Sequence, residues 1–362
     1  MVTVMNETCK KHIDSCRFCW MCRHICPIGN ATGLERNNAR ARALGLSLVN
    51  RGVYDLSEVI DNVYECACCG ACTKECVTGW DPVMFVKGAR RDAALEGKLP
   101  DYIMRLVENV LRSGNAYGVT ERPKTLRAAT NAHAKKCDVL FFLGVDAVAK
   151  APEEAVKAIR VMEKTGIGFT VSAGERPSGQ QLDFLIGAAE ETKQQMLAAA
   201  EQLNEYKTVV CYDPQDALLF KRTCGEYGVR ITAKVETYTA FLARNLASLS
   251  PVKTEKAVVF QDPFQLARDL DEVEEARKII GAYRTVREML CNRKDTMWAG
   301  NILMAEWMPD VMKQVAADRI ANARSVKADT LVTASVSEYK SLRAVEQDDV
   351  KILSLEEMIL GE

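Results

Sequence analysis

The apolar residues of this chain follow one period before about residue 123 and another after it. Between Thr32 and Glu65, a stretch rich in Ala, Leu, Arg and Glu places its apolar residues at helical intervals. These residues are Leu44, Leu48, Val59, Ile60 and Val63. Asp55, with Glu58 three residues later, resembles a capping box and predicts a helix start there. The pattern therefore predicts that the first part of the chain is helical.

The second part of the chain alternates short apolar runs with longer helical patterns. Four runs have the length and β-rich composition of buried strands: Cys137–Gly144, Lys207–Pro214, Lys256–Pro263 and Ala328–Ser335. Alternating strands and helices favour parallel sheets. The first and third runs lie about 119 residues apart and the second and fourth about 121, which predicts one α/β unit duplicated. The recurrence of "YDP" and "QDP" after two of the runs supports the duplication.

Ten of the 14 cysteines fall within the first 76 residues, and eight of them form two runs of nearly equal spacing. The first run is Cys16, Cys19, Cys22 and Cys26 followed by Pro27, and the second is Cys66, Cys69, Cys72 and Cys76 followed by Val77. A [4Fe-4S] cluster needs four thiolates, and this spacing is that of two-cluster bacterial ferredoxins. Cys68 lies off the pattern and is interpreted as a small buried thiol.

In such ferredoxins three close cysteines bind one cluster and the fourth binds the other. We therefore expect two [4Fe-4S] clusters. The first cluster is assigned to Cys16, Cys19, Cys22 and Cys76, and the second cluster to Cys66, Cys69, Cys72 and Cys26. Zinc is the alternative metal. Structural zinc sites usually take two CxxC pairs separated by a longer loop, so a whole run of four cysteines occurring twice favours iron and sulfur.

The two cysteine runs, followed by "VKGARRDA" (Val86–Ala93) and "RSGNAYG" (Arg112–Gly118), resemble the iron–sulfur subunit of glycolate oxidase. They also resemble its relatives among heterodisulfide reductase and anaerobic glycerol-3-phosphate dehydrogenase subunits. The resemblance implies an α+β multi-domain protein in which a two-cluster ferredoxin domain precedes a duplicated cysteine-rich α/β domain. We expect the helical two-cluster domain at residues 1–123 and the two α/β units at 124–250 and 251–362.

The family's cysteine-rich units carry a lone Cys, a CCG and a CxxC, and this chain departs from that pattern at nearly every position. In the first unit the corresponding residues are Val145, Pro177 with Ser178, and Cys211 with Pro214. In the second unit they are Phe264, Trp298 with Ala299, and Ser335 with Glu338. Because a cluster requires thiolates, we expect these degenerate units to bind no metal and to act as a docking scaffold.

Composition narrows the class of partner. The 362 residues include 48 Lys+Arg and 49 Asp+Glu, a formal net charge of -1, which gives no reason to expect nucleic acid or an anionic membrane as partner. The N-terminus has no apolar core of signal-peptide length, and apolar runs such as Val139–Val145 are too short to span a bilayer. We expect a cytoplasmic protein that reaches the inner face of a membrane only through partners.

Iron–sulfur clusters move single electrons, whereas hydride chemistry is normally carried by a flavin or nicotinamide, for which the sequence has no fingerprint. We therefore expect an electron carrier rather than a substrate-converting subunit. Its partner, as the resemblance implies, is an FAD-dependent dehydrogenase of the 2-hydroxy-acid or glycerol-phosphate type. The acceptor is an electron acceptor protein or a quinone-linked protein.

Two other functions stay open. One is a reductase with its own active site in the C-terminal domain, which requires a ligand set or a titratable cluster that the sequence does not reveal. The other is an iron–sulfur redox sensor, which usually has a DNA-binding or other output domain, and no basic helix of that kind is visible.

Overall fold

The computed structural model describes residues 7–362, and its first part is helical. The predicted first domain begins at residue 1, so its first six residues lie outside the described part. The helices of this part are α1 (Glu7–Asp14), α2 (Met21–His24), α3 (Pro27–Thr32), α4 (Ala39–Asn50), α5 (Ile60–Tyr64), α6 (Ala71–Glu75), α7 (Pro82–Leu95), α8 (Asp101–Ser113) and α9 (Lys124–Ala132). The predicted capping box of Asp55 and Glu58 is confirmed, and it opens a 3-10 turn just before α5.

Two four-stranded parallel sheets follow, and they share one topology. The first has the order β2-β1-β3-β4, with β1 (Val139–Phe142), β2 (Phe169–Thr170), β3 (Thr208–Cys211) and β4 (Lys234–Thr237). The second has the order β6-β5-β7-β8, with β5 (Ala257–Gln261), β6 (Thr285–Arg287), β7 (Thr330–Thr333) and β8 (Lys351–Ser354). The α+β fold class and the duplicated parallel α/β unit are confirmed.

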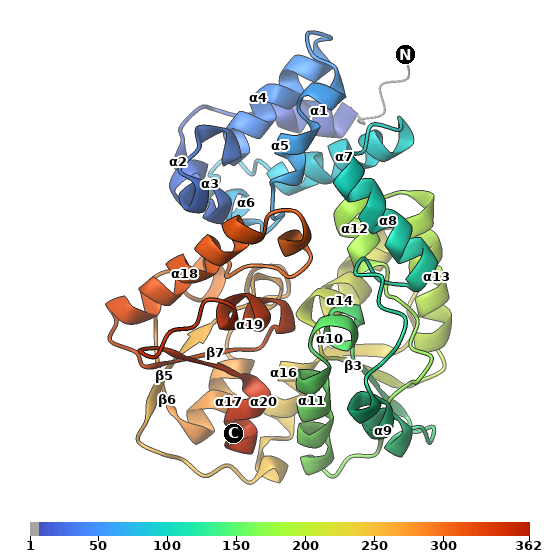
Figure 1. Ribbon diagram of the computed structural model, residues 1–362, viewed down its shortest axis with the longest axis vertical. Helices are drawn as coiled ribbons and strands as arrows, with labels where there is room; N and C mark the ends of the chain where they lie inside the picture. The colour runs from blue at the N-terminus through green and yellow to red at the C-terminus, as the bar shows by residue number, and fades with distance from the viewer. Residues whose placement is uncertain (1–6) are drawn as a thin grey trace.

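Helices cover both sheets. In the first unit these are α10 (Val145–Lys150), α11 (Pro152–Lys164), α12 (Gln180–Ile186), α13 (Glu190–Leu203), α14 (Pro214–Leu218), α15 (Cys224–Glu226) and α16 (Tyr238–Arg244). In the second they are α17 (Glu275–Tyr283), α18 (Pro309–Ser325), α19 (Val336–Arg343) and α20 (Leu355–Leu360). Figure 1 shows the two units side by side, with the N-terminal helices lying across one end of both. There α18 packs on α3, and α12 packs on α7 and α8.

One apolar core joins the two α/β units. It contains Phe141 and Val210 from the central strands of the first sheet, and Val258 and Val332 from those of the second. Because the core is continuous across both sheets, burying its apolar area stabilises the pair of units together. A separate core lies under the cysteine runs and takes in Leu182 of α12, which ties the helical part to the first unit.

The repeated "DP" turns do not mark equivalent positions. Asp213 follows β3, whereas Asp262 follows β5, and the sheet orders pair β5 with β1 and β7 with β3. The recurrence of "YDP" and "QDP" as a sign of duplication is therefore wrong. Asp followed by Pro suits both places because Asp accepts a backbone hydrogen bond and Pro begins a helix or turn.

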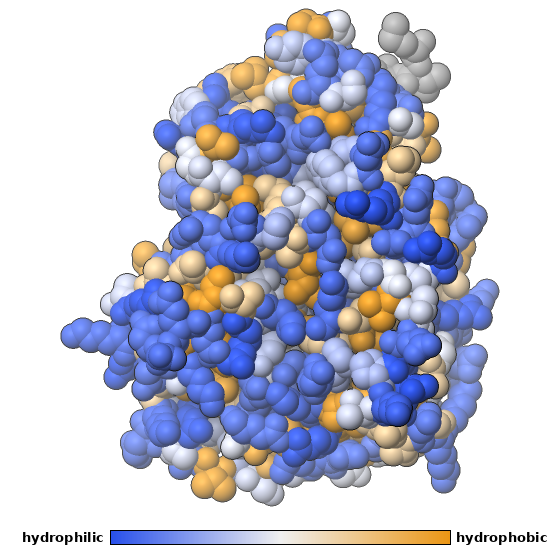
Figure 2. All heavy atoms as spheres, viewed as in Figure 1, coloured by the Kyte–Doolittle hydropathy of each residue, from blue (hydrophilic) through white to orange (hydrophobic). Residues whose placement is uncertain are grey.

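A helix that crosses a membrane must be both long and apolar. Within residues 7–362, no helix combines the length and the apolar character needed to cross a membrane. The face in Figure 2 is mostly hydrophilic, and its hydrophobic residues form small separate groups.

A buried carboxyl group in the second unit should make stability depend on pH. Burial raises the pKa of Glu338 from 4.5 to about 8, although the backbone N–H of Ala299 donates a hydrogen bond to it. Between these two pH values the folded chain holds a proton that the unfolded chain has lost, so stability falls as pH rises, by up to about 1.4 kcal/mol per pH unit. Glu338→Gln should flatten the dependence of the urea midpoint on pH from 5 to 8.

The matched control is Glu255→Gln, because Glu255 is exposed on the surface. It should leave the pH profile of the wild type unchanged. A Glu338→Gln variant that keeps the full slope would contradict the buried, protonated state of Glu338.

Candidate iron–sulfur site

The two cysteine runs have the same local backbone. In the first, Phe18 and Trp20 have left-handed φ values of 57° and 67°, and in the second, Cys68 and Gly70 have 51° and 69°. In each run these are the second and fourth residues after the first cysteine. Left-handed backbone is costly for residues other than glycine, so its use at both places indicates a turn that the site requires.

The ends of the two runs also match. Cys26 has φ -75° and ψ 112°, and Cys76 has φ -76° and ψ 111°. Between these ends and the left-handed residues lie α2 and α6, which pack against each other. The predicted repeat of spacing is thus a repeat of structure, and the two runs lie side by side.

Backbone N–H groups point at cysteine sulfurs in both runs. Phe18 N donates to Cys16 Sγ at 3.5 Å, and Cys68 N donates to Cys66 Sγ at 3.4 Å. The N–H of Gly29 donates to Cys26 Sγ at 3.4 Å. Such hydrogen bonds stabilise a thiolate, the form in which cysteine binds iron.

The charge of Cys26 acts on cysteines of both runs, because it raises the pKa of Cys22 in the first run and of Cys69 and Cys72 in the second. Burial raises the pKa of Cys69 to about 11, and the charges of Cys26 and Cys66 raise it further. Burial also raises the pKa of Cys72, with repulsion from Cys66, Cys69 and Cys26 added. Four close thiols that repel one another as thiolates are stabilised in that form by a bound cationic centre.

The first run is nearer to the surface. Burial raises the pKa of Cys22 to about 11, whereas Cys19 is exposed. Cys76 contacts its own segment, with its sulfur 3.2 Å from the hydroxyl of Thr78. Burial raises the pKa of Cys76, but hydrogen bonds from Thr78 and Trp80 outweigh burial, so the pKa is lowered. Its place in the first cluster therefore rests on the spacing.

Within residues 7–362, no three His, Cys, Asp or Glu side chains converge as ligands of one ion. A [4Fe-4S] cluster does not need that convergence, because its four thiolates bind four different iron atoms.

Three arginines supply positive charge around the second run. Arg42 is buried, and burial alone lowers its pKa. The negative charges of the neighbouring Cys66 and Cys26 have the larger effect, so the pKa of Arg42 is raised. Its Nη2 has no hydrogen-bond partner of good geometry among the described residues. A buried guanidinium beside thiolates suits an anionic cluster.

The other two arginines hold the second run by its carbonyl groups. Arg90, fully buried on α7, donates to Cys66 O at 2.6 Å, to Val63 O at 3.2 Å and to Phe184 O at 2.7 Å. Arg268, from the second α/β unit, donates twice to Cys69 O, at 3.0 and 2.8 Å. Both arginines place charge beside the ligands and fix the loop that carries them.

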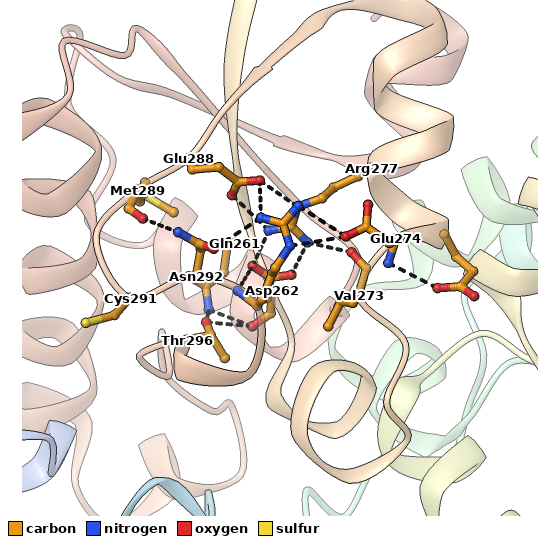
Figure 3. A network of polar contacts seen from close by, with 12 residues as sticks. Gln261, Asp262, Val273, Glu274, Arg277, Glu288, Met289, Cys291, Asn292 and Thr296 are labelled. Atoms are coloured by element: carbon orange, nitrogen blue, oxygen red, sulfur yellow. Dashed lines mark hydrogen bonds and ion pairs between the residues drawn. The ribbon is translucent and has the colours of Figure 1, made fainter. Parts of the chain in front are cut away.

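Figure 3 shows the polar contacts around Asp262, which follows β5, and Arg277; the segment Gln265–Asp269, which carries Arg268, lies between these two residues in the chain. Arg277 forms a two-bond pair with the buried carboxylate of Asp262, at 2.6 and 2.8 Å, and binds Glu288 on its other side. The hydroxyl of Thr296 donates to Asp262 O at 2.9 Å. Bidentate arginine pairs fix geometry strongly, so this network anchors the turn from which Arg268 reaches the cysteines.

A cavity of about 570 Å³ lies between the second cysteine run and both α/β units. Asp146, Asp213, Phe264 and Ser337 line it, and they follow β1, β3, β5 and β7. Ligands of parallel α/β proteins bind at this end of the strands. Sequence reasoning missed this cavity because its residues come from segments far apart in the chain.

The duplicated sheets also correct the register of the degenerate motif in the first unit. Cys211 ends β3 as Thr333 ends β7, so Asp213 and Asp216 are the equivalents of Ser335 and Glu338. The placing of Cys211 and Pro214 at the CxxC positions is therefore wrong. Cys211 is instead a buried strand residue of the apolar core.

Comparison with known proteins agrees with the geometry. Residues 12–80 match the family described as the 4Fe-4S dicluster domain. A subunit of the dihydromethanophenazine:CoB–CoM heterodisulfide reductase from Methanosarcina acetivorans is 23% identical over 360 residues, covering 89% of this chain and 86% of that protein. The predicted resemblance and the two [4Fe-4S] clusters are confirmed. The chain is thus an iron–sulfur electron-transfer protein with a 4Fe-4S dicluster domain, and it is related to a heterodisulfide reductase subunit.

Proposed function

We propose that this chain relays electrons through both clusters between an FAD-dependent dehydrogenase and a downstream acceptor. The observation that carries the proposal is the pair of cysteine runs with one backbone, packed side by side through α2 and α6. Bound in these runs, the clusters supply one-electron steps. The protein fixes their distance, and it sets their environment through Arg42, Arg90 and Arg268.

We propose the ligands as the spacing predicts them, with Cys16, Cys19, Cys22 and Cys76 for the first cluster and Cys66, Cys69, Cys72 and Cys26 for the second. The effect of Cys26 on the pKa values of Cys69 and Cys72 supports its place in the second cluster. We further propose that residues 1–123 form the two-cluster domain and that 124–250 and 251–362 are the units that hold it.

Partner subunits are proposed from two features. The relative is by its name one subunit of a heterodisulfide reductase, and a subunit has others beside it. In this chain Phe18, Trp20 and Met21 beside Cys19 are 57%, 41% and 42% exposed. Large exposed apolar side chains around a ligand suit a partner that brings its flavin close to the first cluster.

The crossing of ligands can be tested with two variants. Cys26→Ser should perturb the second cluster most, because its thiolate belongs with Cys69 and Cys72, whereas Cys76→Ser should perturb the first. Electron paramagnetic resonance of each reduced variant, compared with Cys66→Ser and Cys16→Ser, identifies which signal is lost. Spectra in which Cys26→Ser matches Cys16→Ser would reject the crossing.

The relay itself is tested on the complex isolated anaerobically from the native host. We expect the chain to carry a flavin-containing subunit with it, and we expect 2-hydroxy acid or glycerol phosphate to reduce the flavin first and the clusters afterwards. The isolated chain should oxidise neither substrate. Substrate oxidation by the chain alone, or clusters that stay oxidised while the flavin is reduced, would refute the proposal.

A further inference from the structure

The loop of the first cysteine run carries two aromatic residues that its backbone does not require. Phe18 and Trp20 hold the two left-handed positions of this loop, and Cys68 and Gly70 hold the same positions in the second run. Left-handed backbone costs free energy at residues other than glycine, and an aromatic ring does not reduce that cost. Both rings are exposed rather than part of a core. Their place at the surface therefore points to a role in binding.

A cation lies over both rings. The guanidinium carbon of Arg40, at the start of α4, lies 3.9 Å from the centroid of the Trp20 ring and 4.7 Å from that of the Phe18 ring. These cation–π contacts hold the two rings on either side of Cys19 in the chain. They also keep a positive charge at the surface of the first run.

The charge of this region is positive, although the chain as a whole is nearly neutral. Six of the nine charged side chains from Glu7 to Arg40 are basic, whereas the whole chain has a formal net charge of -1. The acidic residues of the region already have basic partners, in the pairs Glu7–Lys10, Asp14–Arg51 and Glu35–Arg23. Lys11, Arg17 and Arg40 have no acidic partner in the part of the chain that the structure describes. Uncompensated cations of this kind attract a negatively charged partner.

The first run is also the run that a second protein can approach most closely. Helix α2, which follows Trp20 directly, packs on α3, α4 and α6 of the helical part. Figure 1 shows α2 at the outer edge of the molecule. Cys19 is exposed there, whereas Cys66, Cys69 and Cys72 of the second run are buried or half-buried. A partner that covers this edge therefore lies next to a ligand of the first cluster.

We propose that the first-cluster surface, formed by Arg17, Phe18, Trp20, Met21 and Arg40, binds an acidic face of the flavin-containing partner. This assignment rests on the proposed relay, because it names the chemistry of the partner face that docks there. The aromatic rings are buried at the centre of the interface and exclude water from the first cluster. The arginines around them pair with carboxylates of the partner.

The test uses the full-length chain, tagged and captured anaerobically from the native host together with its bound subunits. The captured complex is washed with increasing NaCl, and the flavin that remains is measured per chain. Because salt screens pairs of exposed charges, flavin retention should fall as salt rises. Arg17→Glu and Trp20→Ala should each weaken binding about tenfold, which leaves about a tenth of the flavin at the salt concentration where the wild type keeps half.

Two matched controls test the loss of charge and of apolar surface elsewhere. Arg127→Glu reverses the charge of an exposed arginine on α9, at the opposite end of the molecule in Figure 1. Leu197→Ala removes a side chain of α13 that is 43% exposed, close to the 41% of Trp20. Both should retain flavin as the wild type does. Iron content is measured on every variant, and Arg17→Glu alone decides the test if Trp20→Ala loses iron.

Three results would overturn the docking surface. The first is wild-type flavin retention in Arg17→Glu and Trp20→Ala when their iron content is also that of the wild type. The second is retention that does not fall with salt, which would contradict an acidic partner face. The third is binding of the wild type, but not of Arg17→Glu, to phosphatidylglycerol vesicles with flavin retention unchanged, which would assign the surface to a lipid membrane. A captured complex without any flavin-containing subunit would instead refute the relay.

Discussion

Cys22→Ser and Cys72→Ser should each abolish electron transfer through the chain and leave reduction of the partner flavin by its substrate intact. Each substitution removes one thiolate from a different cluster, and a relay in series fails when either cluster is lost. The flavin keeps its rate because its substrate reacts on the partner protein. Stopped-flow absorbance of the complex separates the flavin phase from the cluster phase, and the second phase should vanish in both variants.

Cys137→Ser is the matched control, since Cys137 lies just before β1, away from both runs. It should show both phases at the rates of the wild type. A normal cluster phase in Cys22→Ser or Cys72→Ser would show that electrons bypass one of the clusters.

Arg90→Leu should destabilise the protein by about 3–4 kcal/mol and make the second cluster harder to reduce. The change leaves three buried or partly buried carbonyl oxygens, those of Val63, Cys66 and Phe184, without their donor. It also removes a positive charge beside a centre that becomes more negative on reduction. Urea unfolding gives the first effect, and a redox titration followed by electron paramagnetic resonance gives the second.

Arg105→Leu, at an exposed position of α8, controls for the loss of an arginine as such. It should change neither the urea midpoint nor the potential. An Arg90→Leu protein with wild-type stability and potential would mean that the buried guanidinium does not hold the second run.

The central strands were predictable and the edge strands were not. The runs around β1, β3, β5 and β7 stand out because central strands of a parallel sheet are covered on both faces and are apolar throughout. The edge strands β2 and β6 have two and three residues, too few to show a period. The edge strands β4 ("KVET") and β8 ("KILS") have four residues but begin with an exposed lysine and are not apolar throughout. The Asp–Pro sequences wrongly indicated equivalent positions in the two units, because Asp and Pro are favoured wherever a strand is followed by a turn into a helix.

The site was predictable as far as it is local in the chain. Cysteine spacing predicts the ligands because three of the four cysteines proposed for each cluster lie close together in one run. Arg268 was not predictable, since it lies 199 residues from the Cys69 carbonyl that it binds. Arg90 lies in the recognisable motif "VKGARRDA", but its role was not predictable, because the three carbonyl groups that it binds come together only in the folded chain.

Anaerobic reductive titration of the holoprotein tests the two-cluster relay most directly, with iron and sulfide determined on the same sample. We expect about eight iron and eight sulfide per chain, and the uptake of two electrons in one-electron steps, because each [4Fe-4S] cluster accepts one. Cys72→Ser should halve the electron uptake. About four iron with a single electron taken up by the wild type, or stoichiometric zinc with none, would contradict the account.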